Sequence, residues 1–175
     1  VGAMAGTSSF YIPPVNFGMV EDNLFRCGQP HELNLPFLEK LNLTKCVYLG
    51  TEDPPQSFLN FVDDQEIDLQ LLGPEDGKMD WKMSWNPMSE DIIIKALEIV
   101  LDSKNYPLCL VDSVGRHRVG TVVGCLRKLQ RWNLTSIFEE YRRYAGSKVR
   151  QLNEQFIELF DTDLVTIPEN KPHWL

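Results

Sequence analysis

The chain has 175 residues, of which 43% are hydrophobic and 24% are charged, as expected for a globular protein with its own core. Its formal net charge of -8 argues against a nucleic-acid-binding protein, because phosphate backbones are recognised by basic surfaces. No stretch reaches the roughly 20 apolar residues of a membrane span, and no signal peptide is recognised. We therefore expect a cytoplasmic protein that binds neither nucleic acid nor membrane.

The first nine residues are small and featureless, and we interpret residues 1–9 as a disordered leader or a cloning scar. Residues 10–175 are expected to form a single domain. The four cysteines are scattered without a CxxC pair or clustered histidines, so we expect buried free thiols, no metal site and no cofactor. They are Cys27, Cys46, Cys109 and Cys125.

Apolar periodicity and turn residues predict alternating elements in the first half of the chain. In order, they are a strand over Val20–Arg26, a helix over Leu33–Leu41, a strand over Thr44–Leu49, a helix over Gln56–Gln65 and a strand over Ile67–Leu72. The segment Gly73–Asn86 contains glycines, a proline and several acids, and is predicted to be a long loop.

The second half begins with a helix over Ile92–Leu101 and the most apolar strand, Tyr106–Val111, which we expect at the centre of the sheet. Only helices follow, over residues 117–132, 134–145 and 148–161. Strands and helices in alternation, followed by helices, predict an α/β fold with a central, mostly parallel sheet flanked by helices.

The segment after the central strand is the most informative one. A buried strand ends at Val111, a turn contains Gly115, and a helix follows directly. The first N–H groups of a helix lack partners and carry partial positive charge, so this turn is a candidate anion cradle that Arg118 could close. The alternative is an ordinary strand–turn–helix connection with surface arginines. The predicted phosphate-binding residues are Ser113, Val114, Gly115, Arg116, His117 and Arg118.

The run Gly115-Arg116-His117-Arg118 with Gly120 resembles the H-C-x5-R-[ST]-G signature of cysteine-dependent phosphatases. It is most similar to the plant and fungal atypical dual-specificity phosphatases, including the fungal oxidant-induced cell-cycle arrest proteins, which carry G-[KR]-H-R-T-G. Further segments resemble this family at Ile12–Phe17, Phe25–Pro30, Gly124–Leu134 and Glu140–Tyr144. The resemblance implies a protein-tyrosine-phosphatase-like fold and, as substrates, inositol pyrophosphates or phosphoproteins.

Three positions depart from the family pattern. Asp112 stands at the position of the nucleophilic cysteine, Val111 replaces the preceding histidine, and Val119 replaces the Ser/Thr that activates the thiolate as a leaving group. A carboxylate is a weaker nucleophile than a thiolate. Its charge also repels phosphate, by roughly 4 kcal/mol at about 4 Å and an effective dielectric near 20. We expect weakened phosphate binding and little or no turnover; alternatively, Asp112 itself takes the cradle amides and Arg118.

Other residues have two interpretations each. In the family a loop acid protonates the leaving group, which makes Glu75, Asp76 and Asp80 candidate general acids, or simply an exposed acidic loop. Cys109 is an alternative nucleophile, but strand alternation points it away from the cradle. His117 is interpreted as a hydrogen-bonded residue that stabilises the loop.

The leading hypothesis is a pseudophosphatase that binds a phosphate-containing small molecule or a phosphoprotein, alone or in a complex with related phosphatase-like proteins. The alternative is an active dual-specificity or inositol pyrophosphate phosphatase in which an engineered change has placed Asp112 where the enzyme has cysteine. An interaction module without any ligand is a third reading.

Overall fold

A computed structural model describes residues 10–73 and 88–175. A five-stranded sheet with the strand order β1-β2-β5-β3-β4 forms its centre. β2, β5, β3 and β4 run parallel, and β1 pairs antiparallel with β2 at the edge. The strands are β1 (Gly18–Glu21), β2 (Leu24–Gly28), β3 (Lys45–Tyr48), β4 (Asp68–Leu71) and β5 (Leu108–Asp112). The predicted mostly parallel sheet, with its most apolar strand in the middle, is confirmed.

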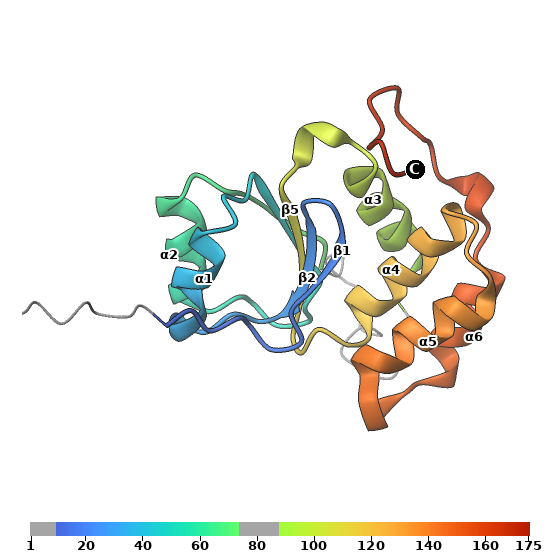
Figure 1. The fold of residues 1–175 in the computed structure, drawn as a ribbon, viewed down its shortest axis with the longest axis horizontal. Coiled ribbons are helices and arrows are strands. Elements are labelled where there is room, and N and C mark those ends of the chain that lie inside the picture. The colour runs from blue at the N-terminus through green and yellow to red at the C-terminus, as the bar shows by residue number, and fades with distance from the viewer. Residues whose placement is uncertain (1–9, 74–87) are drawn as a thin grey trace, which may run out of the picture.

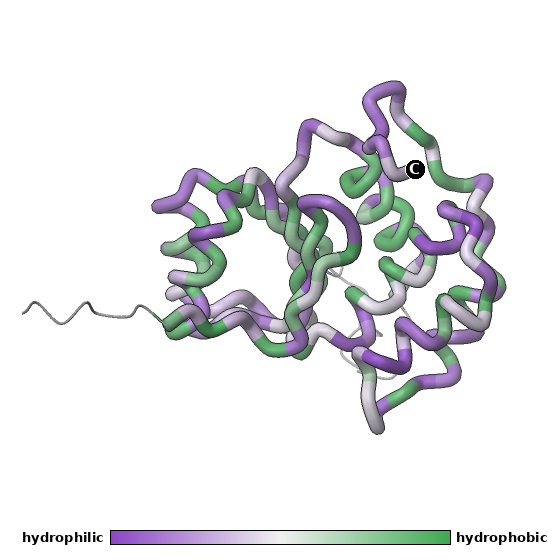
Figure 2. The backbone as a smooth tube through the Cα atoms, viewed as in Figure 1, coloured by the Kyte–Doolittle hydropathy of each residue, from purple (hydrophilic) through white to green (hydrophobic). Residues whose placement is uncertain are grey.

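Helices cover the sheet in two unequal layers (Figure 1). The helices α1 (Leu35–Glu39) and α2 (Gln56–Asp64) lie on one face, whereas the helices that follow β4 in the chain lie on the other. Those helices are α3 (Glu90–Val100), α4 (Arg118–Leu129), α5 (Leu134–Ala145) and α6 (Gln151–Leu159). Each layer has its own buried apolar cluster against the sheet. Hydropathy follows this arrangement, since α3 is strongly hydrophobic and the outer α5 carries hydrophilic stretches (Figure 2).

Alternation along β5 decides which residues face the larger helical layer. Leu108 and Leu110 belong to the cluster with α3 and α4, whereas Cys109 and Val111 belong to the cluster with α1 and α2. Successive side chains of a strand point to opposite faces, so Asp112, the last residue of β5, returns to the α4 side. The strand thus delivers the Asp112 side chain to the first turn of α4.

One predicted element was wrong and one lies outside the described residues. The single strand predicted over Val20–Arg26 is two strands, because the chain reverses between Glu21 and Leu24, with Asn23 in the left-handed region at φ 61°. Asn tolerates this conformation better than most residues, so the Asn at position 23 indicates a turn that the prediction of a single strand did not take into account. The predicted loop Gly73–Asn86 falls outside the described residues except for Gly73.

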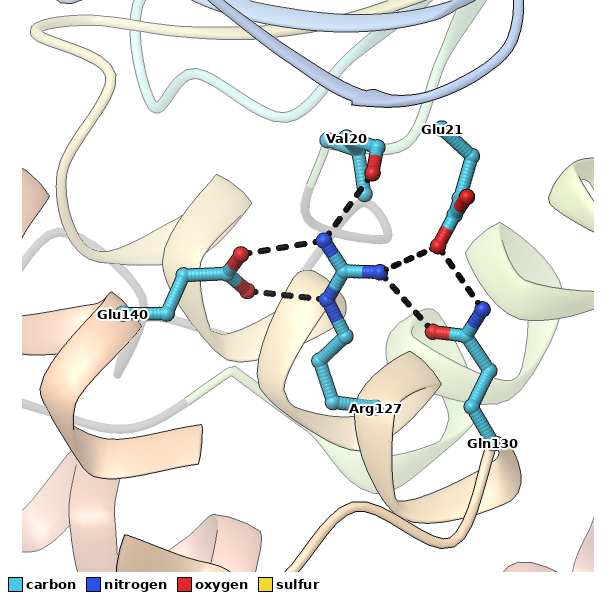
Figure 3. Close-up of polar contacts among 5 residues, drawn as sticks. All are labelled: Val20, Glu21, Arg127, Gln130 and Glu140. Carbon is cyan, nitrogen blue, oxygen red and sulfur yellow. Dashed lines mark hydrogen bonds and ion pairs between the residues drawn. The ribbon is translucent and has the colours of Figure 1, made fainter. Parts of the chain in front are cut away.

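A buried arginine fastens α4 to the rest of the layer (Figure 3). Arg127 donates to both carboxylate oxygens of Glu140 at 3.0 Å, to Glu21 at 2.7 Å, to Gln130 at 2.9 Å and to the Val20 carbonyl at 3.0 Å. These five bonds match the five N–H donors of a guanidinium. Arg127 therefore ties β1, α4 and α5 together.

None of the helices in residues 10–73 and 88–175 is both long and apolar enough to cross a bilayer. The same ranges contain no cluster of three or more His, Cys, Asp or Glu side chains that could hold a metal ion.

Candidate functional site

The turn between β5 and α4 forms a tight cradle that depends on Gly115. This residue adopts φ 73°, and a Cβ built on it would lie 2.7 Å from the backbone nitrogen of Gly28. Both the left-handed conformation and the close approach of a neighbouring strand require glycine. The backbone of β2 therefore supports the cradle from behind.

The carboxylate of Asp112 occupies the inside of the cradle. Its Oδ1 accepts backbone N–H bonds from Val114, at 3.2 Å, and from Gly115. Its Oδ2 accepts bonds from Arg118, at 3.1 Å, and Val119, at 3.0 Å. The last two N–H groups belong to the first turn of α4, where the helix dipole favours an anion. The Asp112 side chain is thus the resident anion of the loop.

Burial and hydrogen bonding act in opposite directions on Asp112, which is only 3% exposed. Burial raises the pKa of its carboxyl above the ordinary value and is the largest effect. The backbone N–H bonds and the positive charge of Arg26 oppose this and lower the pKa. Desolvation is therefore only partly compensated.

Three N–H groups of the cradle are not used by Asp112. Within residues 10–73 and 88–175, the backbone N–H groups of Ser113, Arg116 and His117 have no protein acceptor. The guanidinium of Arg118 donates from Nη1 to the Leu49 carbonyl oxygen at 3.3 Å rather than to Asp112. Asp112 takes cradle amides, as one alternative expected, but it does not take the Arg118 side chain.

His117 is held by a small polar network behind the cradle. The Tyr141 hydroxyl accepts bonds from Asn153 Nδ2 at 3.1 Å and from the Arg150 N–H at 3.3 Å, and it lies 2.9 Å from His117 Nδ1. Its hydrogen is therefore left for His117, whose Nδ1 acts as the acceptor. Burial, followed by the charges of Arg150 and Arg116, lowers the pKa of His117 to about 4. His117 is thus neutral near pH 7, as a loop-stabilising histidine should be.

Asn16 and Arg26, for which the sequence predicted no role in the site, contact backbone carbonyl groups of the cradle. Asn16 Nδ2 lies 3.3 Å from both the Val114 and the Gly115 carbonyl oxygens, and Arg26 Nη2 donates to the Gly115 oxygen at 3.2 Å. Both residues stand in segments quoted for the family resemblance, and a charged residue inside an apolar strand was the available signal for Arg26. Carbonyls held outward leave the N–H groups of the loop pointing inward.

The remaining candidates are placed as follows. Cys109 is buried on the opposite face of the sheet, with its Sγ 3.7 Å from that of Cys27. Val111 is buried on that same face, whereas Val119 is buried on the α4 side. The candidate general acids lie outside the described residues. They are Glu75, Asp76 and Asp80.

Comparisons with known proteins agree with the fold and give the family. A model described as "Tyrosine phosphatase family" matches residues 11–175. A probable tyrosine-protein phosphatase of Dictyostelium discoideum, DG1060, is 65% identical over 94% of this chain and 96% of its own length. A putative tyrosine-protein phosphatase of Mycosarcoma maydis, OCA1, is 51% identical over 88% and 96%, respectively.

A solved structure shares the fold at substantial identity. The core catalytic domain of the PP-IP phosphatase SIW14 from S. cerevisiae, in complex with citrate, is 40% identical, with a TM-score of 0.78 over 88% of this chain and 90% of that one. The predicted phosphatase-like α/β fold and the resemblance to the fungal proteins are both confirmed. The chain belongs to the tyrosine phosphatase family, close to the fungal OCA1 proteins.

Proposed function

We propose that this chain is a pseudophosphatase, which keeps an anion cradle but does not hydrolyse phosphate esters. The observation that carries the proposal is the set of four backbone N–H bonds to the carboxylate of Asp112. An ionised carboxylate offers about four lone-pair sites, and each oxygen accepts two of these bonds. The atoms that would attack phosphorus are therefore already engaged.

The supports of the usual chemistry are also missing. Val119 is buried and has no hydroxyl to assist a leaving group, and Val111 points to the opposite face of the sheet. A nucleophile needs a free lone pair directed at the substrate. Asp112 has none left, because its two oxygens accept four backbone N–H bonds.

Binding is supported by the donors that Asp112 leaves unused. The N–H groups of Ser113, Arg116 and His117 have no protein acceptor in the described part of the chain, and Arg118 offers a planar guanidinium suited to phosphate. As ligand we propose a phosphate-containing small molecule or a phosphoprotein segment, bound by the chain alone or in a complex with related phosphatase-fold proteins in the cytoplasm. The description of the 40% identical structure as a PP-IP phosphatase makes an inositol pyrophosphate the first ligand to test.

A turnover assay on 5-diphosphoinositol polyphosphate and on p-nitrophenyl phosphate tests the proposal. We expect the wild-type chain and its Arg118→Ala variant to be equally inactive. Hydrolysis by the wild type that Arg118→Ala abolishes would overturn the proposal and show that another residue acts as nucleophile.

The second candidate is an active phosphatase in which cysteine has been changed to Asp112, and the relatives named as phosphatases favour it. In an Asp112→Cys variant, the same amides would stabilise a thiolate, so activity should appear if the cradle is otherwise competent. Adding Val119→Thr should raise that activity further. If both variants stay inactive, the loss of catalytic activity involves more than residue 112, which supports the pseudophosphatase proposal. A chain whose melting temperature is unchanged by phosphate, sulfate and inositol polyphosphates would be an interaction module without an anion ligand.

A further inference from the structure

Arg26 is a buried charge next to the cradle. It lies in β2, is 1% exposed, and is paired in register with Leu110, two residues from the Gly28–Asp112 pair. Residues two apart on a strand share a face, so Arg26 and the Asp112 position face the same helical layer. The Arg26 Nη2 atom would lie 3.7 Å from a Cβ at Gly120, which places the guanidinium beneath the first turn of α4.

The guanidinium has few partners for a group that is so deeply buried. Nη2 donates to the Gly115 carbonyl, and the guanidinium carbon lies 3.7 Å from the centre of the Tyr144 ring. Nε and Nη1 have no hydrogen-bond partner among the described residues. Unpaired buried donors are costly and call for a compensating role.

Among the described residues, two carboxylates raise the pKa of Arg26, Glu140 and then Asp112. Glu140 is already paired through both oxygens with another cation, Arg127. Within residues 10–73 and 88–175, Asp112 accepts hydrogen bonds from backbone N–H groups and from no cationic side chain. Gly115 connects the two charges, since its N–H donates to Asp112 and its carbonyl accepts from Arg26.

We propose that Arg26 is the buried counter-charge of the cradle. It compensates the charge of the Asp112 carboxylate across Gly115, so that the guanidinium of Arg118 is not needed for this and can bind an anion ligand. The part concerning Arg118 rests on the proposed function, whereas the pairing of Arg26 with Asp112 does not. Arg26 acts through the loop and is a positioning residue.

The charged surroundings of both groups agree with this assignment. The positive charge of Arg26 lowers the pKa of Asp112. Burial lowers the pKa of Arg26, whereas Tyr144, Glu140 and the negative charge of Asp112, in this order, raise it. The other charged or titratable groups that influence them are Tyr48 and Arg118 near Asp112, and Tyr144, Glu140 and Arg127 near Arg26.

The direct test measures the pKa of Asp112 by carbon-13 NMR of its side-chain carboxyl during a pH titration. Arg26→Met should raise this pKa by about 1, because an opposite charge nearby has been removed. Arg26→Lys should retain part of the wild-type value. Arg142→Met is the matched control, since it removes an arginine charge that is paired with Glu154 on α6, and it should leave the Asp112 titration unchanged.

The outcomes separate this proposal from the proposed function. An Asp112 pKa that is equal in wild type and Arg26→Met overturns the counter-charge. If Arg26→Met does not fold, Arg26→Gln gives the same comparison with a polar side chain. Inorganic phosphate is then titrated by calorimetry at pH 7.5, where we expect about tenfold weaker binding by Arg26→Met than by wild type. Absence of phosphate binding in every variant, with the pKa shift present, would contradict the proposed function but leave the counter-charge standing.

Discussion

Two buried arginines on the same helical side of the sheet are used in opposite ways. Arg127 makes five hydrogen bonds and pairs with Glu21 and Glu140. Arg26 makes one, and two of its nitrogens lack partners in the described structure. A fully paired guanidinium holds elements together, whereas an underpaired one beside an anion cradle contributes its charge. The clamp around Arg127 and the cradle around Arg26 should therefore respond differently to mutation.

The largest loss of stability is expected at the clamp. Arg127→Met leaves the carboxylates of Glu140 and Glu21 without their cation, and removal of one member of a buried ion pair costs about 4 kcal/mol. Urea unfolding measures this directly. A loss below that of Arg26→Met would reverse the proposed contrast between the two arginines.

The next largest effect is expected at the turn of the cradle. Gly115→Ala places a Cβ 2.7 Å from the Gly28 nitrogen at φ 73°, and we expect a loss of about 3 kcal/mol from strain and overpacking. Gly73 is the control, because it has no positive φ and nothing lies within 4 Å of a Cβ built on it. Gly73→Ala should change the free energy of unfolding by less than about 1 kcal/mol. Equal losses at both glycines in denaturant unfolding would show that the cradle is not tightly packed against β2.

Arg26→Met should reduce stability much less than Arg127→Met does. The substitution removes one hydrogen bond to Gly115 and the stacking on Tyr144, but it also removes two unsatisfied donors. The expected rise of about 1 in the pKa of Asp112 costs about 1.4 kcal/mol at pH 7, and removal of the two unsatisfied donors offsets part of this, so we expect a net loss of about 1 kcal/mol. A loss comparable to that of Arg127→Met would indicate a structural clamp in place of a counter-charge.

The smallest effect concerns pH. The pKa of His117 is lowered to about 4 in the folded chain, below an unfolded value of about 6.5. The unfolded chain therefore binds the proton more readily, and stability falls as the pH drops from about 6.5 toward 4. In the His117→Gln variant, the melting temperature should change less with pH in this window than in the wild type. An unchanged slope would mean that burial and the neighbouring arginines do not hold His117 neutral in the folded chain.

Sequence patterns were sufficient where burial follows a simple period. The apolar run that became β5, the glycine-containing turn and the helix after it were all predicted close to their observed positions. The hairpin between β1 and β2 was missed because Asp22 and Asn23 interrupt a run that also reads as one strand. Hydrophobic periodicity does not reveal a reversal of two residues.

The site was only partly readable from the sequence. The chemistry of Asp112 and the amide donors followed from local order along the chain, since strand, turn and helix are contiguous. The roles of Asn16 and Arg26 could not be predicted in this way, because these residues lie 99 and 89 positions before Gly115 in the sequence. The direction of the Arg118 side chain, toward Leu49, likewise depends on the neighbouring strand.

A phosphate titration followed in the ¹H–¹⁵N spectrum tests the central claim most directly, which is that Asp112 takes four N–H groups of the cradle and leaves those of Ser113, Arg116 and His117 for an anion. We predict saturable shifts that are largest at the amides of Ser113, Arg116 and His117, while those of Gly115 and Val119 stay bonded to the Asp112 carboxylate. The claim is contradicted if Gly115 and Val119 shift most, because phosphate has then displaced the carboxylate, or if no amide of the loop shifts at all.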